Sequence, residues 1–294
     1  FDLLTEHPTG EEYAQYLEQV SKFFKLAIET NIEVKEVKDK NGGFLLNTSK
    51  GVYASSFVIW AAGEYQYPKT NSFEGEKLCS HYSELSSFLE VMGKRSVVIG
   101  AYESGFDAAI NLVNLGKKVT LIDNSNYLEL VNSDSSYSLS PFTRDRIKKA
   151  INHIDYYAET RVEKVKFEHA KYVVTTDNYM TFTSDDEPIN CTGFDTSLKL
   201  VEALFEFEED YPLLTEFDES RKTKNLFLVG PQVKHGTALF CFIYKYRQRF
   251  AIVAEEIAKR LKVPIGKIGE VIGEYKYNNF YLNDLSCCDD ECVC

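Results

Sequence analysis

The chain has 294 residues, with 33 Lys or Arg against 45 Asp or Glu, so its formal net charge is −12. Hydrophobic residues make up 44% of it and charged residues 27%, which excludes a largely disordered chain. The acidic excess disfavours nucleic acid and anionic membranes as partners, because both attract Lys and Arg. The length favours two domains, or one domain inserted into another. We expect a cytoplasmic protein that acts on a small molecule; the sequence leaves its oligomeric state open.

The first part of the chain shows one helical pattern and several β-like runs. Tyr13, Leu17, Val20 and Phe24 recur at intervals of three and four residues, which predicts an amphipathic helix over residues 9–27. The other elements expected before residue 94 are strands at 32–37 and 44–47 around the hairpin signal Asn41-Gly42-Gly43, a strand at 52–60, a connector at 64–80 and a short helix at 83–92.

A strand, a glycine turn, a helix and a second strand follow in close succession. The strand is expected over 96–99, the turn over 100–105, the helix from near Ser104, and the second strand over 119–123. This βαβ order predicts an α/β protein with a parallel sheet within residues 94–190. The elements expected after it are a loop at 124–140, a helix at 143–151, β-like runs at 156–167 and 172–176, strands at 187–190 and 226–230, and a long helix at 238–261.

The glycine turn carries the main functional signal. In the dinucleotide fingerprint G-x-G-x-x-G, the backbone approaches a pyrophosphate and the N-terminus of a helix meets its charge. Gly100 and Gly105 occupy the first and third glycine positions, with Ser104 beside the pyrophosphate, and Tyr102 replaces the middle glycine. Asp123 ends the second strand, where an acid bonds the ribose 2′-hydroxyl, so we expect NADH to be preferred over NADPH. The competing interpretation is a purely structural turn, with Asp123 as a capping acid.

Short stretches spread over nearly the whole chain carry a family resemblance. They are Tyr13–Leu17, Trp60–Gly63, His81–Glu84, Gly100–Ala109, Leu139–Arg144, Thr192–Asp195, Tyr244–Phe250 and Ser286–Cys294. On these stretches the sequence resembles the bacterial CzcO-type flavin-containing monooxygenase-like flavoproteins.

The resemblance implies the two-dinucleotide-binding-domain flavoprotein fold, an α/β fold. A Rossmann-like NAD(P) domain, 94–193, would be inserted into an FAD-type domain, 1–64 and 194–294, after a connector at 65–93. In such proteins NAD(P)H reduces FAD, which then reacts with oxygen or another acceptor. The FAD-binding G-x-G-x-x-G of the family would lie ahead of residue 1, so we expect an upstream segment to be missing.

The resemblance also implies positions near the cofactors. Gly63 and Gly193 end strands where the chain would pass close to a flat cofactor or cross between domains. Gly230 and a helix that begins at Gly236-Thr237-Ala238 would lie beside the flavin, where a helix N-terminus stabilises negative charge. Gly230 is followed by Pro231, where the family usually has Asp. We identify no catalytic residue; His81 and His235 are expected to form hydrogen bonds.

Four cysteines crowd the end of the chain: Cys287, Cys288, Cys292 and Cys294. Thiolates at this spacing suit zinc or another thiophilic metal, or thiol–disulfide exchange. Two hypotheses about function follow. The first is a pyridine-nucleotide-dependent flavoprotein oxidoreductase. The second is a non-catalytic nucleotide- or metal-binding protein that uses this cysteine tail.

Overall fold

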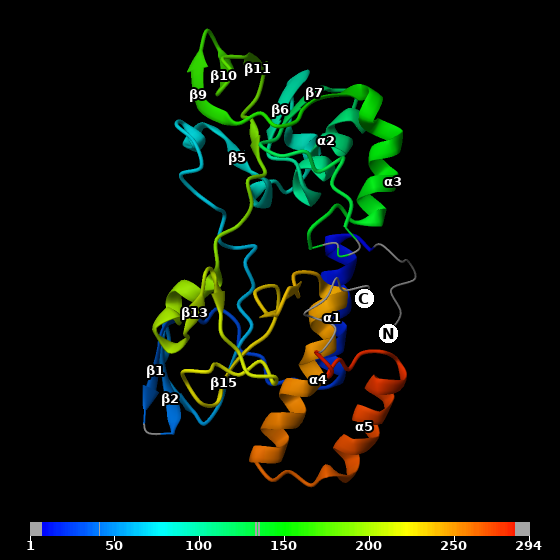
Figure 1. Cartoon of the computed structure of the whole chain (residues 1–294). Coiled ribbons are helices and arrows are strands. Elements are labelled where there is room, and N and C mark those ends of the chain that lie inside the picture. The colour runs from blue at the N-terminus through cyan, green and yellow to red at the C-terminus, as the bar shows by residue number, and fades with distance from the viewer. Residues whose placement is uncertain (1–7, 41, 133, 135, 286–294) are drawn as a thin grey trace. The chain divides into compact units, whose positions relative to one another are not determined.

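The computed structural model describes residues 8–285, apart from 41, 133 and 135 (Figure 1). The chain divides into two compact units, Phe1–Ser55 and Ser56–Cys294. The cysteine tail, with its predicted metal or redox role, lies outside the described residues. Within those residues, no helix combines the length and the apolar character that a membrane crossing requires.

The first unit contains one helix and a three-stranded antiparallel sheet. Its elements are α1 (Gly10–Phe23), β1 (Val34–Lys40), β2 (Gly43–Thr48) and β3 (Gly51–Ser55), paired in the order β1-β2-β3. Thr9 begins α1 with a capping box: its hydroxyl accepts from the Glu12 N–H, and the Glu12 carboxylate accepts from the Thr9 N–H. The predicted helix and hairpin are confirmed.

The single strand predicted over 52–60 is wrong, because two strands of different sheets follow each other there. β3 ends at Ser55 and pairs with β2, whereas β4 (Val58–Trp60) pairs in parallel with β15 (Leu226–Leu228). β3 is exposed along its length, while Val58 and Trp60 are buried. The apolar run is continuous in sequence although its two halves have different environments.

The second unit is built around a five-stranded parallel sheet. Its order is β5-β12-β6-β7-β8, with bounds β5 (Ser80–His81), β12 (Ile189–Asn190), β6 (Arg95–Ile99), β7 (Lys118–Ile122) and β8 (Ile154–Tyr157). Helix α2 (Glu103–Asn114) connects β6 to β7, and α3 (Pro141–Ala150) precedes β8. The predicted βαβ unit and parallel sheet are confirmed. β6 reads as a continuous apolar run because both its faces are buried.

A separate antiparallel sheet follows the parallel one, in the order β11-β10-β9. Its strands are β9 (Val162–Glu168), β10 (Lys171–Thr176) and β11 (Thr181–Ser184). The β-like run predicted over 156–167 is therefore split between two sheets. Between β8 and β9 the chain turns beside the end of β7, where the Glu159 N–H donates to the Ser125 carbonyl at 2.9 Å.

The short helix predicted over 83–92 is also wrong. Two separate 3₁₀ turns, η2 (Tyr82–Glu84) and η3 (Phe88–Glu90), occupy the segment, because His81 and Ser87 each cap a turn of their own. The elements of the second unit not yet given are η1 (Glu76–Leu78), η4 (Ile151–His153), η5 (Ser197–Leu200), η6 (Glu202–Leu204), β13 (Phe207–Glu208), β14 (Tyr211–Pro212), β16 (Lys234–His235), β17 (Ala238–Leu239), α4 (Ile243–Arg260) and α5 (Ile265–Tyr277).

The long helix predicted from residue 238 begins later, at Ile243. His235 pairs with Ala238 in the β16–β17 hairpin, so Gly236 and Thr237 form its turn, and Gly236 has a left-handed φ of 54°. Gly236, Thr237 and Ala238 therefore do not form a helix N-terminus, so that prediction is wrong. Their position beside the flavin stays a prediction.

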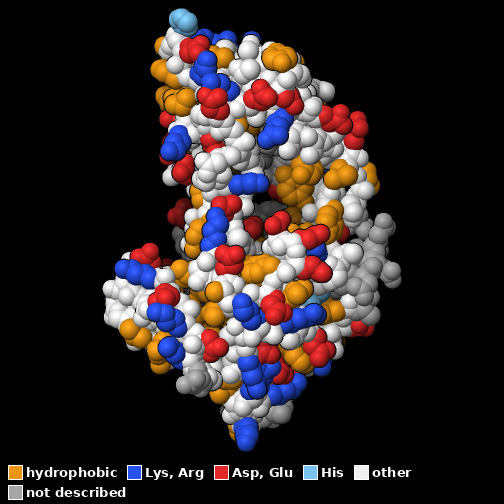
Figure 2. All heavy atoms as spheres, turned by 60° about the vertical axis from the view of Figure 1, so that its left-hand side comes forward, with side chains coloured by type: hydrophobic (Ala, Val, Ile, Leu, Met, Phe, Trp, Pro, Cys, Tyr) orange, Lys and Arg blue, Asp and Glu red, His pale blue; other side chains and the backbone are white. Residues whose placement is uncertain are grey.

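The β4–β15 pair joins segments that lie on either side of the nucleotide-type unit in the sequence. Such pairing is expected of a domain interrupted by an insertion, and the domain bounds themselves stay a prediction. On the face seen in Figure 2, acidic and basic side chains are interspersed.

Candidate nucleotide-binding site

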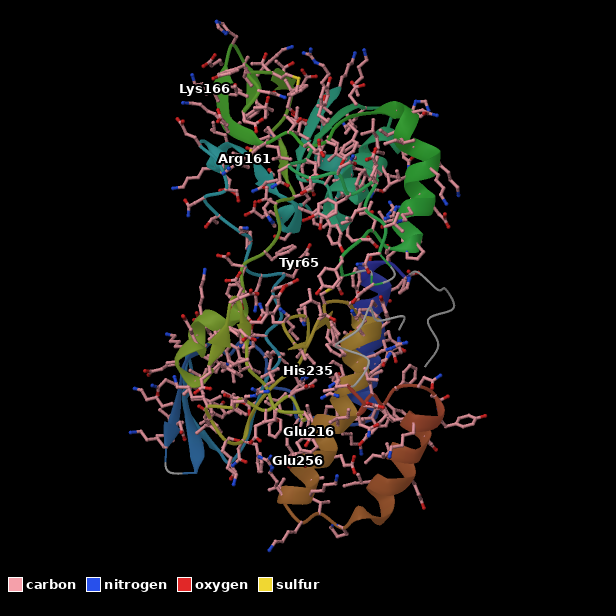
Figure 3. All side chains as sticks on the ribbon, in the orientation of Figure 1. Tyr65, Arg161, Lys166, Glu216, His235 and Glu256 are labelled. Carbon is pink, nitrogen blue, oxygen red and sulfur yellow. The ribbon has the colours of Figure 1, made fainter. Side chains whose placement is uncertain are left out.

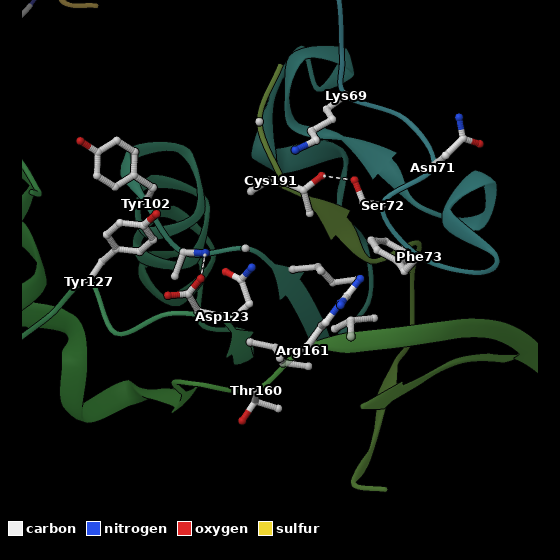
Figure 4. A pocket seen from close by; sticks show the side chains of 18 residues that line it. Lys69, Asn71, Ser72, Phe73, Tyr102, Asp123, Tyr127, Thr160, Arg161 and Cys191 are labelled. Atoms are coloured by element: carbon white, nitrogen blue, oxygen red, sulfur yellow. Dashed lines mark hydrogen bonds between the residues drawn. The ribbon is translucent and has the colours of Figure 1, made fainter. Parts of the chain in front are cut away.

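A pocket of about 560 Å³ lies at the carboxyl edge of the parallel sheet (Figure 4). The residues that follow β6, β7 and β12 line it, together with parts of segments 69–73 and 160–162. Ligands of open α/β sheets bind at this edge, outside the carboxyl ends of the strands. The pocket volume falls within the range of small-molecule sites.

The glycine turn is so tightly packed that neither of its two glycines has room for a side chain. Gly100 has a φ of +92°, and a Cβ there would lie 2.6 Å from the Cys191 carbonyl oxygen. A Cβ on Gly105 would lie 1.9 Å from the Gly100 carbonyl oxygen. α2 begins at Glu103 without a side-chain capping bond from Tyr102, so its first N–H groups follow directly on the turn. This is the backbone arrangement that accommodates a pyrophosphate.

Tyr102, at the middle position of the fingerprint, is engaged with the 124–140 loop. Its hydroxyl donates to the Ser138 carbonyl at 3.0 Å, and its ring centroid lies 4.8 Å from that of Tyr127. Both rings lie together at one side of the pocket (Figure 4). The tyrosine therefore forms part of the pocket wall.

Asp123 is buried, with 2% of its surface exposed, and its carboxylate is held by the surrounding backbone. It accepts from the Ala101 N–H at 3.3 Å and from the Tyr156 hydroxyl at 3.3 Å. The N–H groups of Asn124 and Ser125 also donate to it. Burial nevertheless raises the pKa of Asp123 from 3.8 to about 6. The side chain ties the end of β7 to the glycine turn.

The raised pKa of Asp123 predicts a pH dependence of stability. The folded chain binds a proton that the unfolded chain lacks at pH values between the two pKa values, so the free energy of unfolding rises as the pH falls through this window. Relative to Asp123→Asn, the unaltered chain should gain roughly 2–3 kcal/mol between about pH 7 and pH 4. Urea unfolding of both proteins across this range measures the difference. Parallel pH profiles would contradict the expectation.

The structure brings some of the predicted site residues together and leaves others apart. Gly100, Tyr102, Asp123 and Gly193 all line the pocket. Ser104 lies in the first turn of α2 and does not line it. Gly63 and Gly230 follow β4 and β15 and are likewise not among its lining residues.

Sequence reasoning missed two cations of the pocket, Lys69 and Arg161. No local motif marks either residue, since each reaches the pocket from a segment distant from the glycine turn. It also missed two buried ion pairs. Lys245 donates to both Asp134 oxygens, at 2.8 and 2.7 Å, and Arg249 pairs with Asp218.

Both histidines form hydrogen bonds, as expected. His81 bonds the Gly193 carbonyl through Nε2 at 3.0 Å and Ser83 through Nδ1 at 2.8 Å. His235, labelled in Figure 3, lies in the second unit and bonds Asp218 at 2.6 Å through Nε2. Among the described side chains, no group of three or more His, Cys, Asp or Glu residues could hold a metal ion.

The cysteines of the described chain are free thiols: Cys79, Cys191 and Cys241. Burial raises the pKa of Cys79 to about 12, and it also raises the pKa of the other two thiols. Because the thiolate is the reactive form, we expect iodoacetamide at about pH 8 to alkylate these cysteines far more slowly in the folded chain than in urea. Mass spectrometry of the labelled peptides measures this, and equal rates in the two states would contradict it.

Comparison with known proteins identifies relatives of this chain. The pyridine nucleotide-disulphide oxidoreductase family model matches residues 1–230. Bacilliredoxin reductase Bdr of Bacillus subtilis is 25% identical over 76% of this chain and 68% of its own length. An uncharacterized CzcO-like oxidoreductase of Geobacillus kaustophilus is 31% identical, over 36% of this chain and 32% of its own length.

The fold is shared with solved structures. Bacillithiol disulfide reductase Bdr (YpdA) of Staphylococcus aureus superposes with a TM-score of 0.73 at 21% identity, covering 88% of this chain and 80% of that one. The predicted two-dinucleotide-binding-domain flavoprotein fold is thereby confirmed. The chain belongs to the pyridine nucleotide-disulphide oxidoreductase family.

Proposed function

We propose that the chain is a flavoprotein oxidoreductase that binds NAD(P)H in the pocket at the glycine turn. The observation that carries the proposal is the turn itself, in which Gly100 and Gly105 have no room for a Cβ and α2 begins immediately after. A pyrophosphate needs such close backbone approach together with a helix N-terminus. The residues present therefore fit a pyridine dinucleotide.

The residues around the pocket would hold and orient the coenzyme. The N–H groups at the start of α2 would bind the pyrophosphate, and Asp123 would keep the turn in place through the Ala101 N–H. Tyr102 and Tyr127 would bound the pocket on one side, and Cys191, Thr192 and Gly193 would border it after β12. Orientation of the coenzyme is the contribution of the protein, because hydride chemistry belongs to the cofactors.

FAD, which the family implies, would accept the hydride and pass electrons onward. The described residues fit it in one respect. The parallel strands β4 and β15 are followed by Gly63 and Gly230, and a Cβ at either glycine would meet no atom within 4 Å. We assign Gly63 and Gly230 to the flavin side on this basis. A small-molecule acceptor, monooxygenase-like chemistry and a cytoplasmic location stay predictions.

Anaerobic reduction tests the proposal. The chain is incubated with FAD, freed of excess cofactor and mixed with NADPH or NADH while the flavin absorbance at about 450 nm is followed. We expect the absorbance to be lost at a rate that saturates with coenzyme concentration. A chain that binds the coenzyme but leaves the flavin oxidised would support the alternative, a non-catalytic nucleotide-binding protein. A chain that binds neither cofactor would refute the proposal.

A further inference from the structure

More basic than acidic side chains line the pocket, although the chain as a whole has a formal net charge of −12. Lys69 and Arg161 line it, and Asp123 is the one carboxylate among the described residues that line it. Within the described part of the chain, neither cationic side chain has an ion-pair, hydrogen-bond or ring partner. A dinucleotide carries its phosphates as anions, so two unpaired cations in this pocket indicate where phosphate charge would be received.

The two cations belong to different halves of the pocket. Arg161 follows Thr160, whose N–H donates to the Asp123 carbonyl at 2.7 Å, so it lies beside the end of β7. The Lys69 N–H donates to the Gly193 carbonyl at 3.1 Å, which places its backbone beside the segment that follows β12. β12 and β7 flank β6, the strand that leads into the glycine turn. Figure 4 shows the two side chains entering the pocket from different sides.

The adenosine ribose of a bound dinucleotide lies at the end of the second strand of a βαβ unit, which here is β7. The group expected to meet its 2′-hydroxyl, Asp123, is almost fully buried and already accepts hydrogen bonds from the Ala101 N–H and the Tyr156 hydroxyl. Arg161, by contrast, is exposed to the pocket. The ribose end of the site therefore presents a guanidinium instead of a free carboxylate.

We propose that Arg161 binds the 2′-phosphate of NADPH and makes the pocket selective for NADPH over NADH. This inference rests on the proposed function, since it assigns a residue to the same nucleotide site. It replaces the NADH preference that the position of Asp123 suggests in the sequence. A guanidinium offers several N–H donors in a plane and matches phosphate oxygens, which a ribose hydroxyl does not require.

Equilibrium binding of NADPH and NADH to three proteins tests the inference without any flavin or turnover. The proteins are the unaltered chain, Arg161→Gln and Lys69→Gln. The unaltered chain should bind NADPH roughly 10- to 100-fold more tightly than NADH, the range expected for hydrogen bonds to a charged group. Arg161→Gln should remove most of this preference by weakening NADPH alone.

Lys69→Gln is the matched control, because it removes one positive charge from the other side of the same pocket. It should change the two affinities by the same factor, since contacts made there are to groups that both coenzymes share. The fragment 2′,5′-ADP should compete with NADPH for the unaltered chain and lose this ability in Arg161→Gln, whereas 5′-AMP should compete weakly with both.

Three results would overturn the inference: equal or tighter binding of NADH to the unaltered chain, equal weakening of both coenzymes in Arg161→Gln, or unchanged NADPH affinity in that variant. Equal weakening would indicate a pyrophosphate contact and would leave the proposed function standing. If the unaltered chain binds neither coenzyme, the proposed function itself fails, and the inference fails with it.

Discussion

Arg249→Met should lower the free energy of unfolding by about 3–5 kcal/mol, the range for breaking a buried ion pair on one side. Arg249 and Asp218 are both fully buried, and the guanidinium donates to the two carboxylate oxygens at 3.0 and 2.8 Å. It also donates to the Glu216 and Leu282 carbonyls. The variant leaves the Asp218 carboxylate in the interior with His235 as its remaining side-chain partner.

Arg247→Met is the matched control, because it makes the same change on the same helix at an exposed position. Arg247 lies over the Phe280 ring at 4.5 Å, a contact worth roughly 0.5–1 kcal/mol when exposed. Urea unfolding of both variants compares the two positions. Adding Asp218→Asn to Arg249→Met should recover part of the loss, because the buried charge is then removed. If the free energy of unfolding falls by similar amounts at positions 247 and 249, the buried ion pair does not stabilise the fold more than an exposed arginine does.

Gly105→Ala should abolish saturable nucleotide binding and lower the free energy of unfolding by roughly 1–3 kcal/mol, the usual range for an overpacked site. The new methyl group would lie 1.9 Å from the Gly100 carbonyl oxygen, a backbone atom that cannot move without opening the turn. The start of α2 and the end of β6 must then separate. Coenzyme titration and urea unfolding measure the two effects.

Gly273→Ala provides the control for this substitution, since it places the same methyl group in helix α5, where nothing lies within 4 Å. Alanine is favoured over glycine inside a helix by roughly 0.5–1 kcal/mol, so this variant should be slightly more stable and bind coenzyme normally. If Gly105→Ala binds coenzyme normally and is as stable as Gly273→Ala, the close contact at the turn does not constrain the site.

The βαβ unit could be predicted from the sequence because its signals are local. The apolar strand, the glycines at 100 and 105 and the following helical pattern lie within a short segment, and tertiary packing agrees with each of them. By contrast, Gly236-Thr237-Ala238 reads as the start of a helix but forms the turn of a hairpin, because His235 and Ala238 pair across it. Local propensity alone does not distinguish these outcomes.

The charged side of the pocket could not be predicted, because it is assembled from distant segments. Lys69 lies in the connector and Arg161 in the turn before β9, and nothing near either residue marks a phosphate site. The sequence predicts that Asp123 lies at the end of the second strand. Its burial and its bonds to the Ala101 N–H and Tyr156 depend instead on how β7 and β8 pack beside the turn.

Hydrogen exchange in the presence and absence of NADPH tests most directly whether the glycine-turn pocket is the coenzyme site. We expect slower amide exchange with coenzyme in peptides that cover residues 100–106, 122–124 and 191–193, and no change in β1–β3 of the first unit. Binding that leaves exchange at 100–106 unchanged, or that protects only other segments, would contradict it.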